Sequence, residues 1–257
     1  MNYLDAIILG VLQGLTEFLP VSSSGHLVLT QHLLGVKLNG VVFELLVHFG
    51  TLMAVLIYFR ERIIRLILAL FDRSMKTERR MILFLILGTI PAVVVALLFD
   101  DIIEEAFSSP VLTSVMLVIT GFVLLLTGVI KKKGGEVSGG KAFLIGCGQA
   151  LAIFPGISRS GSTIAAGMFV GIKPMEAAEF SFLLSIPAIA GAIVFKLREI
   201  VDLDTTLIGQ YAVGTAVSFL SGLFAVYLLL SIIKKGKFQY FGIYCLIIGI
   251  LGILYFI

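Results

Sequence analysis

Long runs of apolar residues, separated by short polar segments, dominate the pattern along this chain. The runs show neither the alternation of a strand nor the polar stripe of a surface helix, and about 20 apolar residues suffice for a helix to cross a bilayer. The pattern therefore predicts an all-α polytopic membrane protein with six transmembrane helices, at 41–59, 81–99, 111–130, 177–195, 208–231 and 238–257.

Two further apolar regions are interrupted near their middles. Region 4–36 contains Pro20 and a polar string at 22–26, and region 141–172 contains Pro155 and a polar string at 158–162. Proline lacks a backbone donor, and strings of glycine and serine cannot face lipid. We interpret each region as a re-entrant helix–loop–helix hairpin that enters the membrane and returns. Two kinked spanning helices are the alternative.

Composition excludes an ordinary soluble domain. The chain is 59% hydrophobic and 14% charged, with a mean hydropathy of +1.11. Soluble proteins are about 45–50% apolar and about 25% charged. The net charge of +3 carries little weight, because the placement of Lys and Arg matters more than their sum in a membrane protein, and no nucleic-acid partner is expected.

The placement of the charges predicts an orientation. Fourteen of the nineteen Lys and Arg residues lie in the segments 60–80, 131–141 and 234–237, whereas the segment 100–110 has four acidic residues and no basic one. Basic loops stay in the cytoplasm, so we expect 100–110 and both termini outside. The loop 196–207 must then also lie outside, although it carries two basic residues.

The chain also contains an internal repeat. Shifting it by 136 residues places Gln13–Val28 on Gln149–Ile164 with six of sixteen positions identical, and three of these matches fall on the polar strings. Each half holds one hairpin and three spans, so the second half is inverted in the membrane. We expect a single membrane domain over 1–257, with repeats 1–133 and 141–257 and a binding site where the broken helices meet.

The two breaks gather polar residues in apolar surroundings. Ionisable groups at membrane depth are costly and usually functional, which singles out Glu17 and Arg159. Each serine string precedes a half-helix whose free N–H groups suit an anion, and Arg159 can clamp phosphate oxygens. The residues predicted to bind a phosphate-rich substrate are Gln13, Ser22, Ser24, Ser158, Ser160, Gly161 and Thr163. A purely structural Glu17–Arg159 ion pair is the alternative, and it leaves the three consecutive serines and the neighbouring histidine without a role.

Another histidine is a weaker candidate. His48 and Glu44 lie four residues apart at the start of a predicted span, within reach of the breaks. A hydrogen bond between core helices is the interpretation that the sequence favours for them.

Two motifs make the chain similar to a known family. The segment 13–26 reads Gln-Gly-Leu-Thr-Glu-Phe-Leu-Pro-Val-Ser-Ser-Ser-Gly-His, and 155–161 reads Pro-Gly-Ile-Ser-Arg-Ser-Gly. Both resemble signatures of the bacterial undecaprenyl-diphosphate phosphatase family of the bacitracin-resistance type. The resemblance implies hydrolysis of undecaprenyl diphosphate to undecaprenyl phosphate and inorganic phosphate at the outer face of the bacterial cytoplasmic membrane. It also implies a divalent cation, Mg²⁺ or Ca²⁺, and recycling of the lipid carrier for peptidoglycan synthesis; a homodimer is left open.

Four residues are the candidates for catalysis. Arg159 would neutralise phosphate charge, and Glu17 would hold the cation. Ser23 is the candidate nucleophile or substrate-orienting group, with His26 as its base or as the acid for the leaving oxygen. His26 as the nucleophile, and Glu17 activating a water molecule, remain open. A transporter or flippase of an anionic polyprenyl phosphate is the rival function, because inverted repeats with broken helices are typical of transporters.

Overall fold

The computed structural model describes residues 1–34, 42–130, 134–195 and 205–257, and most of them are helical. The predicted basic run Lys131–Lys133 and positions 196–204 of the predicted external loop lie outside these ranges. The described residues form α1 (Tyr3–Phe18), α2 (Ser23–Leu34), α3 (Val42–Tyr58), α4 (Arg60–Phe71), α5 (Lys76–Leu98), α6 (Asp100–Phe107), α7 (Pro110–Leu126), α8 (Gly139–Leu151), α9 (Arg159–Phe169), α10 (Pro174–Phe195), α11 (Ile208–Lys234) and α12 (Tyr240–Phe256). The all-α prediction is confirmed.

Each of the six predicted spans coincides with a helix. Among the described residues, four helices are long and apolar enough to cross a membrane: α5, α7 with the 3-10 turn that follows it, α10, and α11 with the 3-10 turn that precedes it. The pair α3 and α4 is bent by 80° and adds a fifth crossing if its two parts form one span. α12 is apolar but shorter. The chain is therefore a multi-pass membrane protein with four to five candidate spans by length, fewer than the six predicted.

Two segments that we predicted as loops are helical. The basic segment 60–80 contains α4 and the first turn of α5, and the acidic segment 100–110 contains α6. α4 is amphipathic, because apolar residues lie between its arginines at the period of a helix. A count of the charges alone does not show this period. Arg62 on α4 lies 3.7 Å from Glu78 of α5 and 3.2 Å from Glu179 of α10, so α4 is held against both helices.

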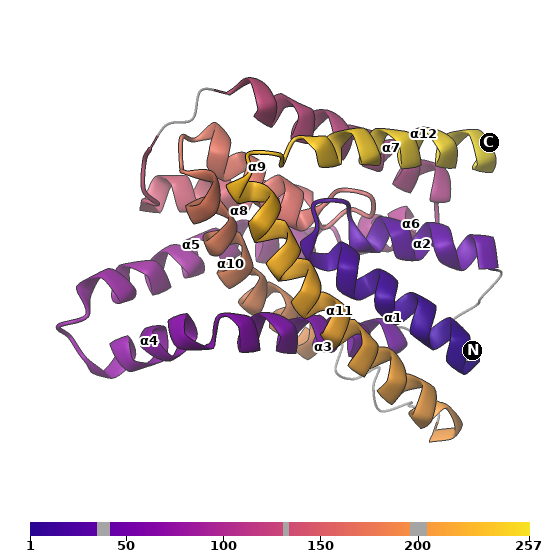
Figure 1. Cartoon of the computed structure of the whole chain (residues 1–257), viewed down its shortest axis with the longest axis horizontal. Helices are drawn as coiled ribbons and strands as arrows, with labels where there is room; N and C mark the ends of the chain where they lie inside the picture. Colours follow the sequence, from indigo (N-terminus) through magenta and orange to yellow (C-terminus); the bar gives the residue numbers. More distant parts are fainter. Residues whose placement is uncertain (35–41, 131–133, 196–204) are drawn as a thin grey trace.

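Helices from the two halves of the chain interleave (Figure 1). α1 packs along α11, α5 packs along α8, and α7 lies beside α12. The first two of these contacts cross at glycines. A Cβ atom on Gly10 would lie 2.6 Å from the carbonyl oxygen of Gly214, and one on Gly146 would lie 2.4 Å from that of Gly88. Because glycine lets two backbones touch, close van der Waals contact stabilises these helix pairs in an apolar environment.

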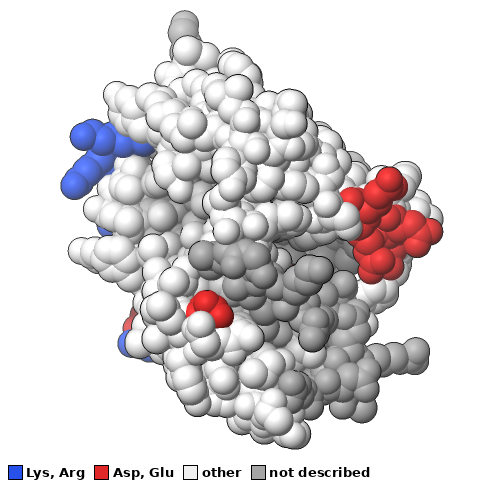
Figure 2. All heavy atoms as spheres, turned by 90° about the vertical axis from the view of Figure 1, so that its right-hand side faces the viewer, with Lys and Arg blue, Asp and Glu red and all other residues white. Residues whose placement is uncertain are grey.

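The charged segments are separated along the bundle. Both chain termini lie at one end, and the turn between α4 and α5 lies at the other (Figure 1). Figure 2 looks at the end with the termini, and its acidic side chains gather mainly at one edge, where α6 carries Asp100, Asp101, Glu104 and Glu105. The basic α4–α5 hairpin and the acidic helix therefore occupy opposite ends, as the charge pattern predicts.

The outer surface is apolar, as a bilayer requires. α5 shows this best, because Gly88 is its one buried residue and it exposes Leu83, Ile86, Ile90, Val93, Val94, Leu97 and Leu98. The interior packs next to the breaks: the ring of Phe18, at the end of α1, meets the ring of Phe182 on α10 edge to face, with centroids 5.7 Å apart. This contact fixes the end of α1 from which the first break starts.

Candidate active site

The first break places a serine at the start of α2. Ser22 has φ of +67°, in the left-handed region that residues other than glycine rarely occupy, so the backbone is strained there. Its hydroxyl accepts a hydrogen bond from the backbone N–H of Gly25 at 3.2 Å and lies 3.3 Å from the hydroxyl of Ser24. Ser22 therefore caps α2, which leaves Ser23 as the first residue of the helix.

The second break repeats these hydrogen bonds with an ordinary φ of −73° at its capping serine. Ser158 caps α9 by accepting a hydrogen bond from the N–H of Gly161 at 3.0 Å, and its hydroxyl lies 3.3 Å from that of Ser160. The Ser160 hydroxyl also donates to the carbonyl oxygen of Leu19 in the first break, at 3.1 Å. Ser22 and Ser158, which were both predicted to bind substrate, thus use their hydroxyls as helix caps.

The two breaks touch each other at equivalent positions. A Cβ atom on Gly25 would lie 3.0 Å from the Cα of Gly156, and one on Gly161 would lie 3.3 Å from the Cβ of Pro20. A shift of 136 residues converts the first of these contacts into the second. The breaks, which we expected to meet, are therefore in direct contact, and the N-termini of α2 and α9 start beside each other.

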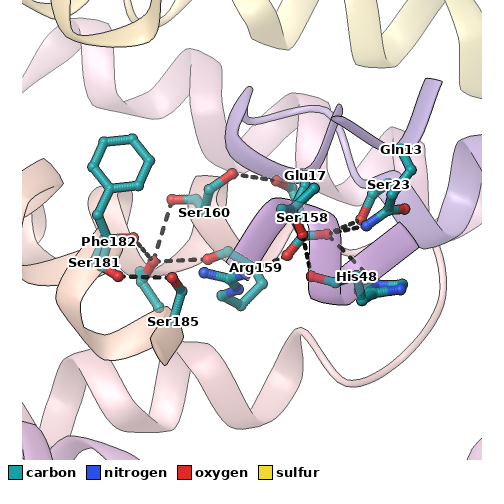
Figure 3. Close-up of polar contacts among 12 residues, drawn as sticks. Gln13, Glu17, Ser23, His48, Ser158, Arg159, Ser160, Ser181, Phe182 and Ser185 are labelled. Atoms are coloured by element: carbon teal, nitrogen blue, oxygen red, sulfur yellow. Dashed lines mark hydrogen bonds and ion pairs between the residues drawn. The ribbon is translucent and has the colours of Figure 1, made fainter. Parts of the chain in front are cut away.

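Glu17 is the centre of the polar cluster at this junction (Figure 3). One carboxylate oxygen, Oε1, accepts a short hydrogen bond from Nη2 of Arg159. The other, Oε2, accepts from the hydroxyl of Ser23 at 2.6 Å and from the amide of Gln13 at 2.9 Å. Nε2 of His48 lies 3.7 Å from Oε2. The cluster joins α1, α2, α3 and α9, and the Glu17 side chain is 6% exposed.

Two atoms of the cluster are buried without a hydrogen-bond partner among the described residues. They are Nη1 of Arg159, a donor, and Oε1 of Gln13, an acceptor. Leaving a buried polar group unpaired costs about 1–3 kcal/mol, and more for a charged group. Such atoms at a functional cluster are ready to bind a ligand or water. Arg159 therefore uses one arm of its fork for Glu17 and keeps the other free.

His26 is buried, but it faces away from this cluster. Its Nδ1 lies 2.8 Å from the carbonyl oxygen of Ser22, and its Nε2 lies 2.8 Å from the hydroxyl of Tyr244 on α12. A carbonyl oxygen only accepts, so Nδ1 carries the proton and Nε2 accepts from Tyr244. The expected Ser23–His26 pair is not formed in this structure, because Ser23 donates to Glu17 instead.

Thr163 is fully buried and braces the start of α9. Its hydroxyl donates to the carbonyl oxygen of Arg159 at 2.8 Å and lies 2.6 Å from the hydroxyl of Ser181 on α10. The contacts of this side chain are with the protein interior. Thr163, predicted as a substrate ligand, is therefore placed to hold the backbone of Arg159.

Comparison with known proteins settles the family. The model of the family described as bacitracin resistance protein BacA matches residues 6–251. The chain belongs to the BacA family. Curated relatives of this BacA-family protein include the undecaprenyl-diphosphatases of Salinibacter ruber, 40% identical over 98% of this chain and 99% of the relative, and of Syntrophotalea carbinolica, 43% identical over 97% of each. That of Carboxydothermus hydrogenoformans is 43% identical over 97% of this chain and 96% of the relative. The family resemblance carried by the two motifs is confirmed.

His48 is the residue of the BacA-family site that sequence reasoning undervalued. The sequence favours a hydrogen bond between core helices for it, but the structure places its Nε2 beside Glu17. The signal that pointed to it was an ionisable side chain within an apolar span. The side chain of Glu44, one turn earlier on α3, accepts a hydrogen bond from Gln31 of α2 at 2.9 Å.

The donors of this BacA-family site fit a divalent cation that is shared with a substrate. Among the described residues, no three His, Cys, Asp or Glu side chains gather to hold a metal ion by themselves. Glu17 and the unpaired Oε1 of Gln13 are hard oxygen donors of the kind that Mg²⁺ and Ca²⁺ prefer. Mg²⁺ commonly binds through one or two carboxylates and completes its coordination with water and substrate phosphate.

Proposed function

We propose that this BacA-family protein hydrolyses undecaprenyl diphosphate to undecaprenyl phosphate and inorganic phosphate. The names of its relatives, at about 40% identity over nearly the whole chain, support this activity. The observation that carries it is that the two terminal nitrogens of Arg159 differ. Nη2 is bound to Glu17, and the buried Nη1 has no partner among the described residues. A phosphate oxygen is the ligand that completes a guanidinium fork.

Substrate binding follows from the charges at the junction. The terminal phosphate would lie against Nη1 of Arg159 and the N-terminus of α2, whose first-turn N–H groups favour an anion. Glu17 and Oε1 of Gln13 would hold a divalent cation, Mg²⁺ or Ca²⁺, and such an ion neutralises charge on the diphosphate. In this arrangement the side chain of Ser23 faces the phosphate.

We infer that Ser23 is the nucleophile and Glu17 its base. The Ser23 hydroxyl already donates to Glu17 Oε2 at 2.6 Å, which is the geometry required of a nucleophile and its base. Oγ forms a bond to the terminal phosphorus as its proton moves to Oε2, and the bond to the bridging oxygen breaks, releasing undecaprenyl phosphate. Water then hydrolyses the phosphoserine. His26, with both ring nitrogens engaged, supports the start of α2 and the contact with α12.

The membrane arrangement is also part of the proposal. We propose six spans and two re-entrant hairpins in inverted repeats over 1–133 and 141–257, in the bacterial cytoplasmic membrane, with the site open to the outer face. The matching serine caps and the matching contacts between the two breaks support the repeats. Recycling of the lipid carrier for peptidoglycan synthesis, and resistance to bacitracin, follow from this placement.

The decisive experiment measures inorganic phosphate released from undecaprenyl diphosphate by the purified chain in detergent, where transport has no meaning. We expect multiple turnovers for the natural sequence and a rate lower by about 10³-fold or more for Glu17→Gln, which loses the base. Binding of undecaprenyl diphosphate without any release of phosphate would refute the hydrolase and favour the transporter. For orientation, a cysteine placed at Met75, with Cys147 and Cys245 removed, should react with a membrane-impermeant reagent only from the cytoplasmic side.

A further inference from the structure

α4 turns sharply away from the helix that precedes it. The bend between α3 and α4 is 80°, and a single residue, Phe59, separates the two helices. In the proposed six-span arrangement α3 crosses the membrane, so a helix nearly perpendicular to it lies close to the membrane plane. The turn from α4 to α5 is at the end of the molecule opposite the chain termini (Figure 1). α4 is therefore placed at the membrane surface of that end.

One side of α4 packs on the protein. Leu66 and Ala69 are buried there, and Arg62 makes the ion pairs that hold the helix against α5 and α10. These three positions are i, i+4 and i+7, which share one side of a helix. The opposite side of α4 therefore faces away from the protein.

That opposite side is apolar and uncovered. Its four large apolar side chains, at positions i, i+3, i+4 and i+7, are each more than half exposed: Ile64 at 53%, Ile67 at 51%, Leu68 at 53% and Phe71 at 84%. A continuous apolar face of this kind marks a surface that a membrane or another molecule covers. On a helix that lies in the membrane plane, the apolar face enters the boundary between headgroups and acyl chains.

The segment 60–80, which contains this face, is basic. It has seven Lys and Arg against three Asp and Glu, a net charge of +4. Two of the acidic side chains are engaged, because Glu78 pairs with Arg62, and Asp72 accepts from the N–H of Ser74 at 2.8 Å. Six exposed cations have no ion-pair partner among the described residues: Arg60, Arg65, Arg73, Lys76, Arg79 and Arg80. Unpaired cations beside an apolar face are complementary to lipids with a negative headgroup.

We propose that α4 lies in the headgroup layer and, with the turn to α5, binds anionic phospholipids. The apolar face enters the acyl chains, and the six unpaired cations gather negative headgroups around it. The proposal goes beyond the proposed function: it uses the six-span arrangement and requires no hydrolase activity. The opposite end of the molecule provides a contrast, because α6 there carries four acidic residues and no basic one.

The natural chain contains no tryptophan, so one substitution introduces a unique fluorophore. Phe71→Trp places it on the apolar face of α4. Leu97→Trp is the matched control, because Leu97 is 62% exposed near the end of α5, directly before the acidic α6. Each full-length variant is reconstituted in vesicles of phosphatidylcholine and phosphatidylglycerol, with bromine on the acyl chains of one lipid or the other. The measurement compares how strongly the two brominated lipids quench the fluorescence.

Both tryptophans should be quenched, because both side chains lie against lipid. For Phe71→Trp, the anionic lipid should be favoured over the neutral one by about fivefold at equal mole fraction, the factor that about one Lys or Arg near the surface supplies. Leu97→Trp should show no such preference. Adding Arg65→Gln and Arg73→Gln to the Phe71→Trp chain should reduce the preference, and so should added salt, because ions screen exposed charges.

Two results would overturn the proposal. If neither lipid quenches Phe71→Trp while both quench Leu97→Trp, the apolar face of α4 is covered by protein, such as a second copy of the chain, or lies in water. If the two lipids quench Phe71→Trp equally, α4 lies in the membrane but does not select anionic lipids. Should Phe71→Trp fail to fold, Ile67→Trp on the same face decides. Phosphate release takes no part in this measurement, so either result leaves the hydrolase proposal unaffected.

Discussion

The two breaks share a scaffold and differ in their chemistry. Ser22 and Ser158 occupy equivalent positions in the repeat and make the same capping hydrogen bond, although Ser22 has a φ of +67° and Ser158 a φ of −73°. The residue that follows each cap is different: Ser23 in the first break and Arg159 in the second. Glu17, the proposed base, corresponds to Ile153. In the proposed mechanism one half supplies the nucleophile and its base, and the other supplies the positive charge of Arg159.

The difference explains why the site forms between the halves. Because the breaks contact each other at equivalent positions, a side chain at the start of α9 lies opposite the end of α1. Arg159 reaches Glu17 across this junction, although the two residues are 142 positions apart in the sequence. Neither half alone contains both charges. The two similar breaks provide two helix N-termini that lie beside each other, and the residues that differ between the breaks bring Glu17 and Arg159 together.

The backbones of the breaks also differ, and this comparison gives the largest expected effect. Gly156 has φ of +91°, and a Cβ atom on it would lie 2.1 Å from the carbonyl oxygen of Thr113. Its equivalent in the first break is Pro20. We expect Gly156→Ala to destabilise the protein by roughly 3–5 kcal/mol, through backbone strain and overlap, and to lower the yield of folded chain. Pro20→Ala should stay within about 1 kcal/mol.

Thermal unfolding in detergent measures both variants. A Gly156→Ala protein as stable as Pro20→Ala would mean that the second break tolerates a side chain, and that the two breaks are more alike than their backbones indicate.

The second prediction concerns the half that carries Ser23, the proposed nucleophile. We expect Ser23→Ala and Glu17→Gln each to reduce kcat by about 10³-fold or more, and the double variant to be no worse than the worse single, because a nucleophile and its base act as a unit. Ser23→Ala and His26→Ala should instead combine additively, since the two side chains bind different partners. Steady-state phosphate release by the single and double variants checks both expectations. Additive losses for Ser23 and Glu17, with non-additive losses for Ser23 and His26, would instead support a Ser23–His26 pair.

How much of this site the sequence predicts depends on whether the signal is local. Glu17, Arg159 and the serine strings stand out because polar residues interrupt apolar runs, and the 136-residue shift brings the strings together. The partner of His26 is Tyr244, 218 positions away, and no local pattern indicates that contact. His48 has the same sequence context as a core histidine, so only the docking of α3 against α1 shows that it faces Glu17.

Helices α4 and α6 were missed for a different physical reason. Both are rich in charge, which marks segments outside the membrane but does not prevent helix formation. An amphipathic helix at the surface carries the same residues as a polar loop, in a period of 3.6. The charge count therefore predicts the sidedness of these segments and says little about their backbone.

The third prediction tests the half that carries Arg159. Arg159→Lys keeps the positive charge but loses the planar fork, so one ammonium group must serve both Glu17 and the phosphate. We expect kcat/KM to fall by about 100-fold, since a hydrogen bond between charged groups is worth about 1.5–3 kcal/mol. Arg62→Lys is the matched control: it also has two acidic neighbours, Glu78 and Glu179, but lies away from the breaks, and it should stay near the natural value. An equal loss of kcat/KM in the two variants would contradict the proposed contact of Arg159 with the phosphate.

The smallest expected effect concerns what the breaks share. Ser158→Ala removes the hydroxyl that accepts from the N–H of Gly161, and loss of such a cap costs about 1 kcal/mol, a decrease in Tm of roughly 2–4 °C for a chain of this size. Ser158→Thr keeps an acceptor and should recover most of that loss. Because this hydroxyl is engaged within the protein, we expect KM for undecaprenyl diphosphate to change by less than about threefold. A rise in KM of tenfold or more at unchanged Tm would mean that Ser158 binds the substrate directly, as its place in the motif predicts, and that the two caps are not equivalent.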